Sequence, residues 1–178
     1  HRDLHSFPTR RSSDLVQEAK KISKDFPHIA MWDTNIDAQM MWLTKNPEDY
    51  GVIVAENMFG DIISDGFAGL VGGLGFACSA NIGDDYAVFE PTHGSAPKYE
   101  KLEPSIVNPI AMFMSACMML DHIGEKETAI KIRKAIAKVI EEGKFRTYDM
   151  MKLRGNTEVF NYGAVSTIDL TDAVIANL

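Results

Sequence analysis

The order of its apolar segments constrains the fold of this chain more than any other feature. Short apolar runs with strand character alternate with longer segments in which apolar residues recur at helical spacing. This alternation predicts an α/β fold. The predicted strands are residues 28–33, 50–55 and 86–90, and the predicted helices are residues 16–26, 36–45, 59–71, 110–123, 126–142 and 169–178. Because three strands are too few for the sheet of a complete α/β domain, we expect the chain to be part of a larger fold.

Proline and glycine mark where these segments end. Pro27 stops the first predicted helix, because proline lacks the amide hydrogen that a helix needs. Gly124 separates the helices 110–123 and 126–142, as expected for a residue just past a helix end. For the last helix we predict Thr167 or Asp169 as the N-terminal cap.

The first fifteen residues, HRDLHSFPTRRSSDL, show no clear apolar period and differ from the sequence that follows. They could serve as a short basic targeting arm. However, a suitable choice of codons lets the whole run be translated from a common sequencing-library adapter. We therefore predict that residues 1–15 are not native, leave them out of the fold, and expect native sequence to have continued upstream.

Composition excludes several classes of protein. The chain has 178 residues, 46% of them hydrophobic, and a formal net charge of −7, which fits a soluble globular protein. No apolar run is long enough to cross a membrane, and no basic cluster predicts nucleic-acid binding. Cys78 and Cys117 lack metal-ligand spacing, so we interpret them as buried thiols of a cytoplasmic protein.

Asp61 and Asp65 are the first candidates for a chemical role. They lie four residues apart in the predicted helix 59–71, so their carboxylates share one helix face and repel each other. Either solvation or a bound cation could offset this repulsion. The residues around them are mostly apolar: Phe59, Ile62, Ile63 and Phe67. We expect this face to be shielded from solvent, which favours a hard divalent cation such as Mg²⁺ or Mn²⁺.

Six blocks of the sequence form a recognisable set: NIDAQMMWLTKNPEDYGVIV, NMFGDIISDGFAGLVGGLGFACSANIGD, AVFEPTHGSAPKY, VNPIAMFMSACMML, TYDMMKL and LTDAVIANL. In these blocks the sequence resembles the β-decarboxylating dehydrogenases, the family that includes isocitrate and 3-isopropylmalate dehydrogenases. The blocks cover nearly all of residues 16–178, in the order that the family has them. The spacing from Asp37 to Asp61 and Asp65 also matches the carboxylates of the family's metal site.

The resemblance implies a C-terminal fragment of the two-domain isopropylmalate-dehydrogenase-like fold, with mixed sheets flanked by helices and a cofactor site unlike the Rossmann motif. Residues 16–71 would belong to a small dimer-forming domain, and residues 72–178 to a large cofactor-binding domain. Asp61 and Asp65 would bind Mg²⁺ or Mn²⁺ in one subunit, and Asp37 would reach the same ion from the partner subunit of a homodimer. The helices 36–45 and 59–71 would pack against their copies in that homodimer.

The implied reaction is the oxidation and decarboxylation of a small 2-hydroxy di- or tricarboxylic acid. The metal would act as Lewis acid, and Asp37 is also a candidate proton acceptor for the substrate hydroxyl. A catalytic Tyr and Lys and the loop that selects the substrate lie upstream in the family. We therefore expect this chain to be inactive alone.

The resemblance also implies the cofactor site. Its candidate residues are His93, Gly94, Ser95, Ala96, Lys98, Tyr99, Val107, Asn108, Tyr148 and Lys152. Lys98 stands where NAD-using relatives tend to carry an acidic residue, and a lysine there attracts a 2′-phosphate. Tyr148 and Lys152 stand where NADP-using isocitrate dehydrogenases place a Tyr and an Arg, which favours NADP, with NAD as the alternative. Lys98 and Lys152 could instead be solvated surface lysines.

One segment departs from the family. The run EKLEPSI at residues 100–106 is longer than the usual stretch, which contains an Ala-Gly pair, and it adds Glu100 and Glu103 near the expected phosphate. The leading interpretation is an NADP-dependent isocitrate dehydrogenase. The alternatives are a 3-isopropylmalate, homoisocitrate or tartrate-type dehydrogenase, a non-catalytic regulatory subunit of the family, and a structural domain that dimerises through its Met-rich helices.

Overall fold

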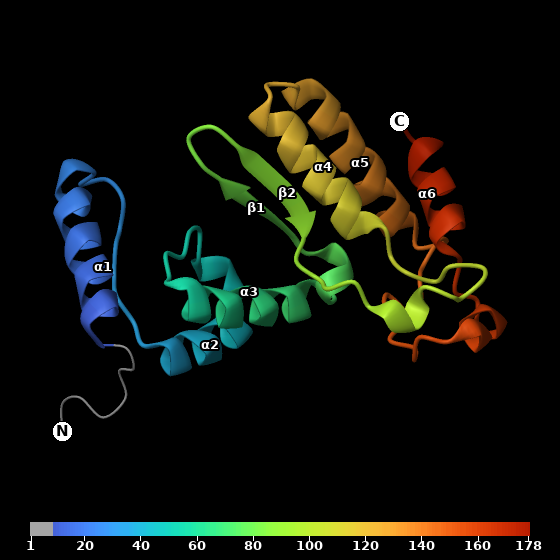
Figure 1. Cartoon of the computed structure of the whole chain (residues 1–178), viewed down its shortest axis with the longest axis horizontal. Helices are drawn as coiled ribbons and strands as arrows, with labels where there is room; N and C mark the ends of the chain where they lie inside the picture. The colour runs from blue at the N-terminus through green and yellow to red at the C-terminus, as the bar shows by residue number, and fades with distance from the viewer. Residues whose placement is uncertain (1–8) are drawn as a thin grey trace. The chain divides into compact units, whose positions relative to one another are not determined.

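The structure is a computed structural model that describes residues 9–178, with side chains from Asp14 onward. The chain forms two compact units, one that ends at Phe67 and one that spans Ala68–Leu178. Figure 1 shows the helices and the single hairpin of these units in chain order. Each unit is described by itself below.

The first unit is helical. Helix α1 spans Thr9–Ile22, α2 spans Ile36–Lys45, and α3 begins at Asn57 and continues to Val71. Leu43 of α2 and Ile63 of α3 are buried, at 1% and 8% exposure. At Gly66 a Cβ atom would lie 2.3 Å from Cε of Met40, so this glycine lets α2 and α3 approach closely.

The prediction of strands at residues 28–33 and 50–55 is wrong for this structure. Both segments are irregular, and no strand of the described chain pairs with either of them. Val52 and Val54 in the second segment are 88% and 69% exposed. An extended segment becomes a strand only when a neighbour satisfies its backbone hydrogen bonds, and apolar composition alone does not supply that neighbour.

The predicted helix 16–26 is shifted. Helix α1 begins at Thr9 and ends at Ile22, and one 3₁₀ turn follows over Ser23–Asp25 before Pro27. Residues 9–15, predicted to be non-native, thus form the first half of α1, and residues 1–8 lie outside the described residues. Helical conformation does not reveal the origin of a segment, so the adapter origin of residues 1–15 stays a prediction.

The second unit contains the hairpin. Strand β1 (Cys78–Ile82) pairs antiparallel with β2 (Ala87–Pro91), so that Cys78 lies opposite Pro91. Helix α4 (Ile110–His122) packs on both strands, α5 (Lys126–Glu142) packs on α4, and α6 (Thr167–Ile175) packs on α5. The sequence predicted β2 with a shift of one residue and missed β1, because Ser79 and Asn81 interrupt its apolar pattern.

Between these helices lies the larger of two apolar cores. It is formed by Ile110, Ala135, Ile136, Val139, Leu170, Ala173 and Val174. The second core, formed by Ile106, Val159 and Ala164, packs against Tyr99 and Tyr148. The second core therefore supports two of the predicted cofactor-site residues.

The helix ends follow their sequence signals closely. Gly124 (φ 92°) and Gly143 (φ 65°) adopt left-handed conformations where α4 and α5 end. The N-cap of α6 is Ser166, not Thr167 or Asp169 as predicted. Asp169 instead completes a capping box with Ser166.

The structure confirms the α/β class. None of the described helices is both long and apolar enough to cross a bilayer.

Candidate active site

The carboxylates of Asp61 and Asp65 stand on one exposed face of α3. Both residues are exposed, as is the neighbouring Ile62 at 45%, whereas Ile63 points into the unit and is 8% exposed. The prediction that this face is shielded is therefore wrong within the chain. Neither carboxylate has a hydrogen bond or an ion pair in the part of the chain that the structure describes. Their oxygens are thus available to a ligand.

Asp37 lies in the first turn of α2 and is also exposed. Its Oδ1 accepts a hydrogen bond of 2.8 Å from the amide of Ala38. Within residues 9–178, no group of three or more His, Cys, Asp or Glu side chains lies close enough together to hold a metal ion. The structure therefore does not bring Asp37 to Asp61 and Asp65 within one chain, and its arrival from a partner subunit stays a prediction.

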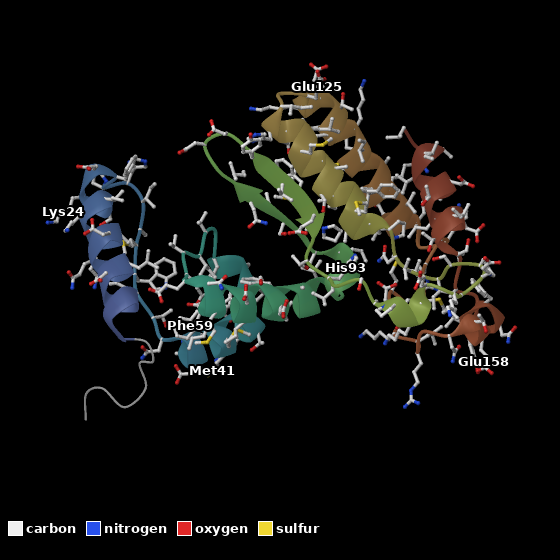
Figure 2. The ribbon with its side chains drawn as sticks, viewed as in Figure 1. Lys24, Met41, Phe59, His93, Glu125 and Glu158 are labelled. Carbon is white, nitrogen blue, oxygen red and sulfur yellow. The ribbon has the colours of Figure 1, made fainter. Side chains whose placement is uncertain are left out.

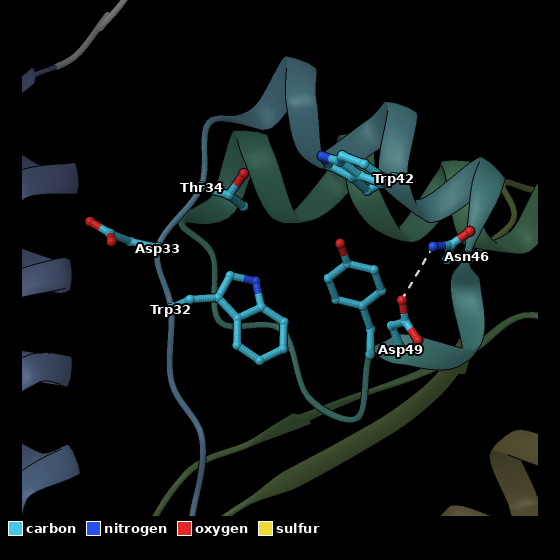
Figure 3. A pocket seen from close by; sticks show the side chains of 7 residues that line it. Trp32, Asp33, Thr34, Trp42, Asn46 and Asp49 are labelled. Carbon is cyan, nitrogen blue, oxygen red and sulfur yellow. Dashed lines mark hydrogen bonds between the residues drawn. The ribbon is translucent and has the colours of Figure 1, made fainter.

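Two cavities of the first unit are lined by residues other than these three aspartates. The larger, about 560 Å³, is lined by Trp32, Asp33, Thr34, Trp42, Asn46, Asp49 and Tyr50. Figure 3 shows Trp32 on one side of this cavity and Trp42 on another, with a hydrogen bond between Asn46 and Asp49. The smaller, about 390 Å³, is lined by residues of the 50–55 segment and of α3, among them Ile63 and Ser64. Asp37, Asp61 and Asp65 line neither cavity.

The predicted cofactor loop follows β2 and is open to solvent. His93, labelled in Figure 2, is exposed, and its Nδ1 lies 3.0 Å from the carbonyl oxygen of Gly94, to which it donates in the Nδ1-protonated tautomer. Gly94, Ser95 and Ala96 are exposed as well. Ala96 has φ 44° and ψ 57°, a left-handed conformation that costs about 1 kcal/mol for a residue with a Cβ atom. The loop thus turns sharply just before Lys98.

Lys98, Tyr99 and Tyr148 form a continuous stack. The Lys98 Nζ lies 4.7 Å from the centroid of the Tyr99 ring, within the range of a cation–π contact. The rings of Tyr99 and Tyr148 lie 5.7 Å apart, tilted by 54°. The structure therefore brings together three predicted cofactor residues that lie up to 50 positions apart in the sequence.

The two tyrosine hydroxyls of this stack are chemically different. The hydrogen bond from Tyr148 lowers the pKa of Tyr99, and the Lys98 ammonium lowers the pKa of Tyr99 further. Burial raises the pKa of Tyr148, and its hydrogen bond to Tyr99 raises it further. These two shifts fit a hydrogen bond that Tyr148 donates to the oxygen of Tyr99.

Asn108 and Val107 are engaged by the protein itself. Asn108 is 8% exposed; its Oδ1 accepts from the Ile110 amide at 3.0 Å, and its Nδ2 donates to Asp149 Oδ2 at 3.0 Å. The carbonyl oxygen of Val107 accepts a 2.6 Å hydrogen bond from Thr167 Oγ1. Both residues therefore hold the segment that precedes α4. Lys152 is exposed and has φ 57°.

The sequence did not identify three residues that support this site. Asp149 also accepts a hydrogen bond from the buried Thr147 at 2.5 Å. A Cβ atom on Gly75 would lie 2.7 Å from Asp149 Oδ2, and a Cβ atom on Gly155 would lie 2.6 Å from the hydroxyl of Tyr99. Asp149 lies in the block TYDMMKL, but only its distant partners reveal its role. No sequence signal marks the requirement for glycine at 75 and 155.

The chain is similar in sequence to known proteins. The sequence model described as isocitrate/isopropylmalate dehydrogenase matches residues 9–174. The chain is 48% identical to a 3-isopropylmalate dehydrogenase of Archaeoglobus fulgidus, over 80% of this chain and 42% of that protein. It is likewise 48% identical to an isocitrate/homoisocitrate dehydrogenase of Thermus thermophilus, over 86% of this chain and 45% of that protein.

The comparison with solved structures agrees with the sequence comparisons. The crystal structure of isocitrate dehydrogenase from Methylococcus capsulatus superposes with a TM-score of 0.81 and 39% identity, over 91% of this chain and 44% of that one. These are dehydrogenases with an α/β fold. The chain belongs to the isocitrate/isopropylmalate dehydrogenase family. It spans less than half the length of the curated relatives it matches.

Proposed function

We propose that this chain forms part of a metal-dependent dehydrogenase that oxidises and decarboxylates a 2-hydroxy acid, with isocitrate as substrate, 2-oxoglutarate as product and NADP as oxidant. The observation that carries the proposal is the exposed pair Asp61 and Asp65, one helical turn apart and without protein partners in the described chain. Family membership supports the reaction class.

The donor set fits a hard divalent cation. Asp61, Asp65 and the partner subunit's Asp37 would supply carboxylate oxygens, which Mg²⁺ and Mn²⁺ prefer. Such an ion supplies a Lewis acid that favours negative charge on the oxygens of the substrate. Asp37 would in addition accept the proton of the substrate hydroxyl, which its exposed position in the first turn of α2 allows.

The preference for NADP rests on the stack of Lys98, Tyr99 and Tyr148. Lys98 provides a positive charge beside Tyr99, and the Tyr99 hydroxyl would act as a hydrogen-bond donor next to that charge. Both features suit a 2′-phosphate. His93 would lie against the adenine, while Gly94, Ser95 and Ala96 leave room for the backbone to approach the phosphates. Lys152 would add a second positive charge.

3-Isopropylmalate is the competing candidate for the substrate. Relatives of similar identity are named for 3-isopropylmalate and for isocitrate or homoisocitrate. A third carboxylate requires cationic or hydroxyl groups, whereas an isopropyl group requires an apolar pocket, and the loop that would choose between them is expected upstream of this chain. An NAD-dependent isopropylmalate-type enzyme is therefore the second candidate.

A homodimer with shared active sites completes the proposal. Asp37 does not join Asp61 and Asp65 within one chain, so a second copy would have to supply it. The exposed apolar residues Met41 and Trp42 on α2 and Met58 and Ile62 on α3 support a surface that a second copy covers.

The test is an assay of the longer protein that carries this chain. Isocitrate and 3-isopropylmalate would each be supplied with NADP and with NAD, with Mn²⁺ and with a chelator. We expect chelation to abolish turnover, and we expect Asp61→Asn to weaken activation by Mn²⁺ by more than about 100-fold, since even indirect partners of metal ligands contribute 10–100-fold. Asp172→Asn, an exposed aspartate on α6, is the matched control.

Each outcome of this assay has a distinct meaning. Turnover that is unaffected by chelation would overturn the metal site. Turnover of 3-isopropylmalate alone would replace the proposed substrate. Absence of turnover with every combination, in a protein that still binds Mn²⁺, would favour the regulatory subunit.

A further inference from the structure

Gly155 lies directly against the hydroxyl end of Tyr99. A Cβ atom built on Gly155 would lie 2.6 Å from the Tyr99 oxygen, 2.7 Å from its Cε1 and 2.8 Å from its Cζ. These distances are far below van der Waals contact, which is about 3.5 Å between heavy atoms. Tyr99 can therefore occupy its observed position only because residue 155 has no side chain.

The backbone of Gly155 does not itself demand glycine. Gly155 is not among the glycines with positive φ, which are Gly72, Gly73, Gly124, Gly143 and Gly163. An alanine at position 155 would thus be acceptable to the backbone. The three atoms nearest to such a Cβ atom all belong to Tyr99, so the Tyr99 ring is the first group that a side chain at 155 would displace.

The half-buried Tyr99 ring has neighbours on several sides. Tyr148 lies on it at 5.7 Å, the Lys98 ammonium lies 4.7 Å from its centroid, and the core of Ile106, Val159 and Ala164 packs against it. A side chain at 155 would therefore displace the hydroxyl of Tyr99 from its position next to the Tyr148 ring. It would also change the direction in which Tyr99 donates.

We propose that Gly155 is a specificity-determining position, which selects NADP over NAD indirectly by allowing the Tyr99 hydroxyl to reach the 2′-phosphate. Gly155 touches no cofactor; it positions Tyr99. This inference rests on the proposed function, because it requires that Tyr99 binds a 2′-phosphate. It adds a residue outside the cofactor loop to the control of cofactor choice.

The test measures binding to the longer protein that carries this chain, by calorimetry, with 2′,5′-ADP and 5′-AMP as probes. The two nucleotides differ by the 2′-phosphate alone, so the ratio of their affinities isolates it from general damage to the site. We expect Gly155→Ala to weaken 2′,5′-ADP about 10-fold or more, the loss typical of one hydrogen bond to a charged group, and to leave 5′-AMP unchanged. Gly69→Ala is the matched control, because a Cβ atom there meets nothing within 4 Å.

A second variant connects the effect to Tyr99. In a Tyr99→Ala background the methyl group at 155 has no ring to displace, so Gly155→Ala should then leave the affinity ratio unchanged. The same reduction in both backgrounds, or equal weakening of both nucleotides, would overturn the role of Gly155. If the unaltered chain binds both nucleotides equally well, the NADP assignment itself fails, and this outcome is distinguishable from the others.

Discussion

The hydroxyl of Tyr99 combines two properties that suit an anion. Its pKa is lowered, first by the hydrogen bond from Tyr148 and then by Lys98, and an O–H of lower pKa is a stronger donor. The same shift sets an upper pH limit for binding. Once Tyr99 loses its proton, it can no longer donate, and its negative charge repels a phosphate.

We therefore predict that the affinity for 2′,5′-ADP falls as pH rises through the pKa of Tyr99, that is, below the value of about 10 of an ordinary tyrosine. Calorimetric titrations from about pH 7 to pH 10 would measure this loss. The Tyr99→Phe variant, which has no hydroxyl to titrate, should bind more weakly at neutral pH and vary less with pH. A pH dependence that is identical in the variant would exclude Tyr99 as its origin.

At the residue scale, the sequence predicted the grouping of Lys98, Tyr99 and Tyr148 better than it predicted their surroundings. The blocks that contain Lys98, Tyr99 and Tyr148 indicated that these residues act together, and the structure places them in one stack. Their roles in catalysis and binding stay predictions. Gly155 and Asp149 could not be predicted, because a requirement for glycine or for a buried hydrogen bond depends on neighbours that are distant in sequence.

At the scale of single elements, the capping box of α6 offers a direct measurement of local stability. Ser166 Oγ accepts from the Asp169 amide at 3.1 Å, and Asp169 Oδ2 accepts from the Ser166 amide at 3.0 Å and from its hydroxyl at 2.7 Å. α6 contributes the fully buried Leu170 to the larger core. Its first turn is therefore coupled to the packing of the whole second unit.

We predict that Ser166→Ala lowers the free energy of unfolding by about 1 kcal/mol, measured by urea denaturation, because it leaves backbone donors without a cap. Thr128→Ala, an exposed hydroxyl removed from α5, should change the stability far less. The Ser166 hydroxyl and amide lower the pKa of Asp169, so this stabilisation is present above the ordinary carboxyl pKa and is lost as pH falls through the lowered value. The variant should lose less stability than the unaltered chain on acidification.

Most helices were predictable from the sequence, whereas two of the three predicted strands were not formed, for a physical reason. The predicted ranges 36–45 and 126–142 coincide with α2 and α5, since helical hydrogen bonds are local and Gly143 and the Asn46-Pro47 pair mark the ends. The apolar runs at 28–33 and 50–55 lack the partner strands that would define them. Strand formation is a property of a pair, so it cannot be predicted from one member alone.

At the scale of the whole molecule, the predicted domain boundary lies close to the boundary between the two observed units. The sequence divides the chain after residue 71, and the structure divides it after Phe67, inside α3. Assignment of these parts to a small and a large domain stays a proposal. The chain spans less than half the length of its curated relatives.

The final prediction follows from the exposed apolar surface of the first unit. Large apolar side chains on α2 and α3 remain exposed, among them Met41 at 55% and Ile62 at 45%. Burial of such surface is favourable by about 25 cal/mol per Å², and two identical copies can bury it reciprocally. We therefore predict that the isolated chain self-associates, with an average mass in sedimentation equilibrium that rises with concentration above the 19.8 kDa of one chain.

The substitutions Met41→Glu and Ile62→Glu would place charges on the surface proposed to be covered, where burial of an unpaired charge is strongly unfavourable. We expect both to shift the mass towards 19.8 kDa. Ile168→Glu is the control, because Ile168 is also exposed, at 62%, but lies on α6 in the second unit. If all three variants associate as the unaltered chain does, then α2 and α3 do not form the contact, and the delivery of Asp37 by a second copy loses its structural support.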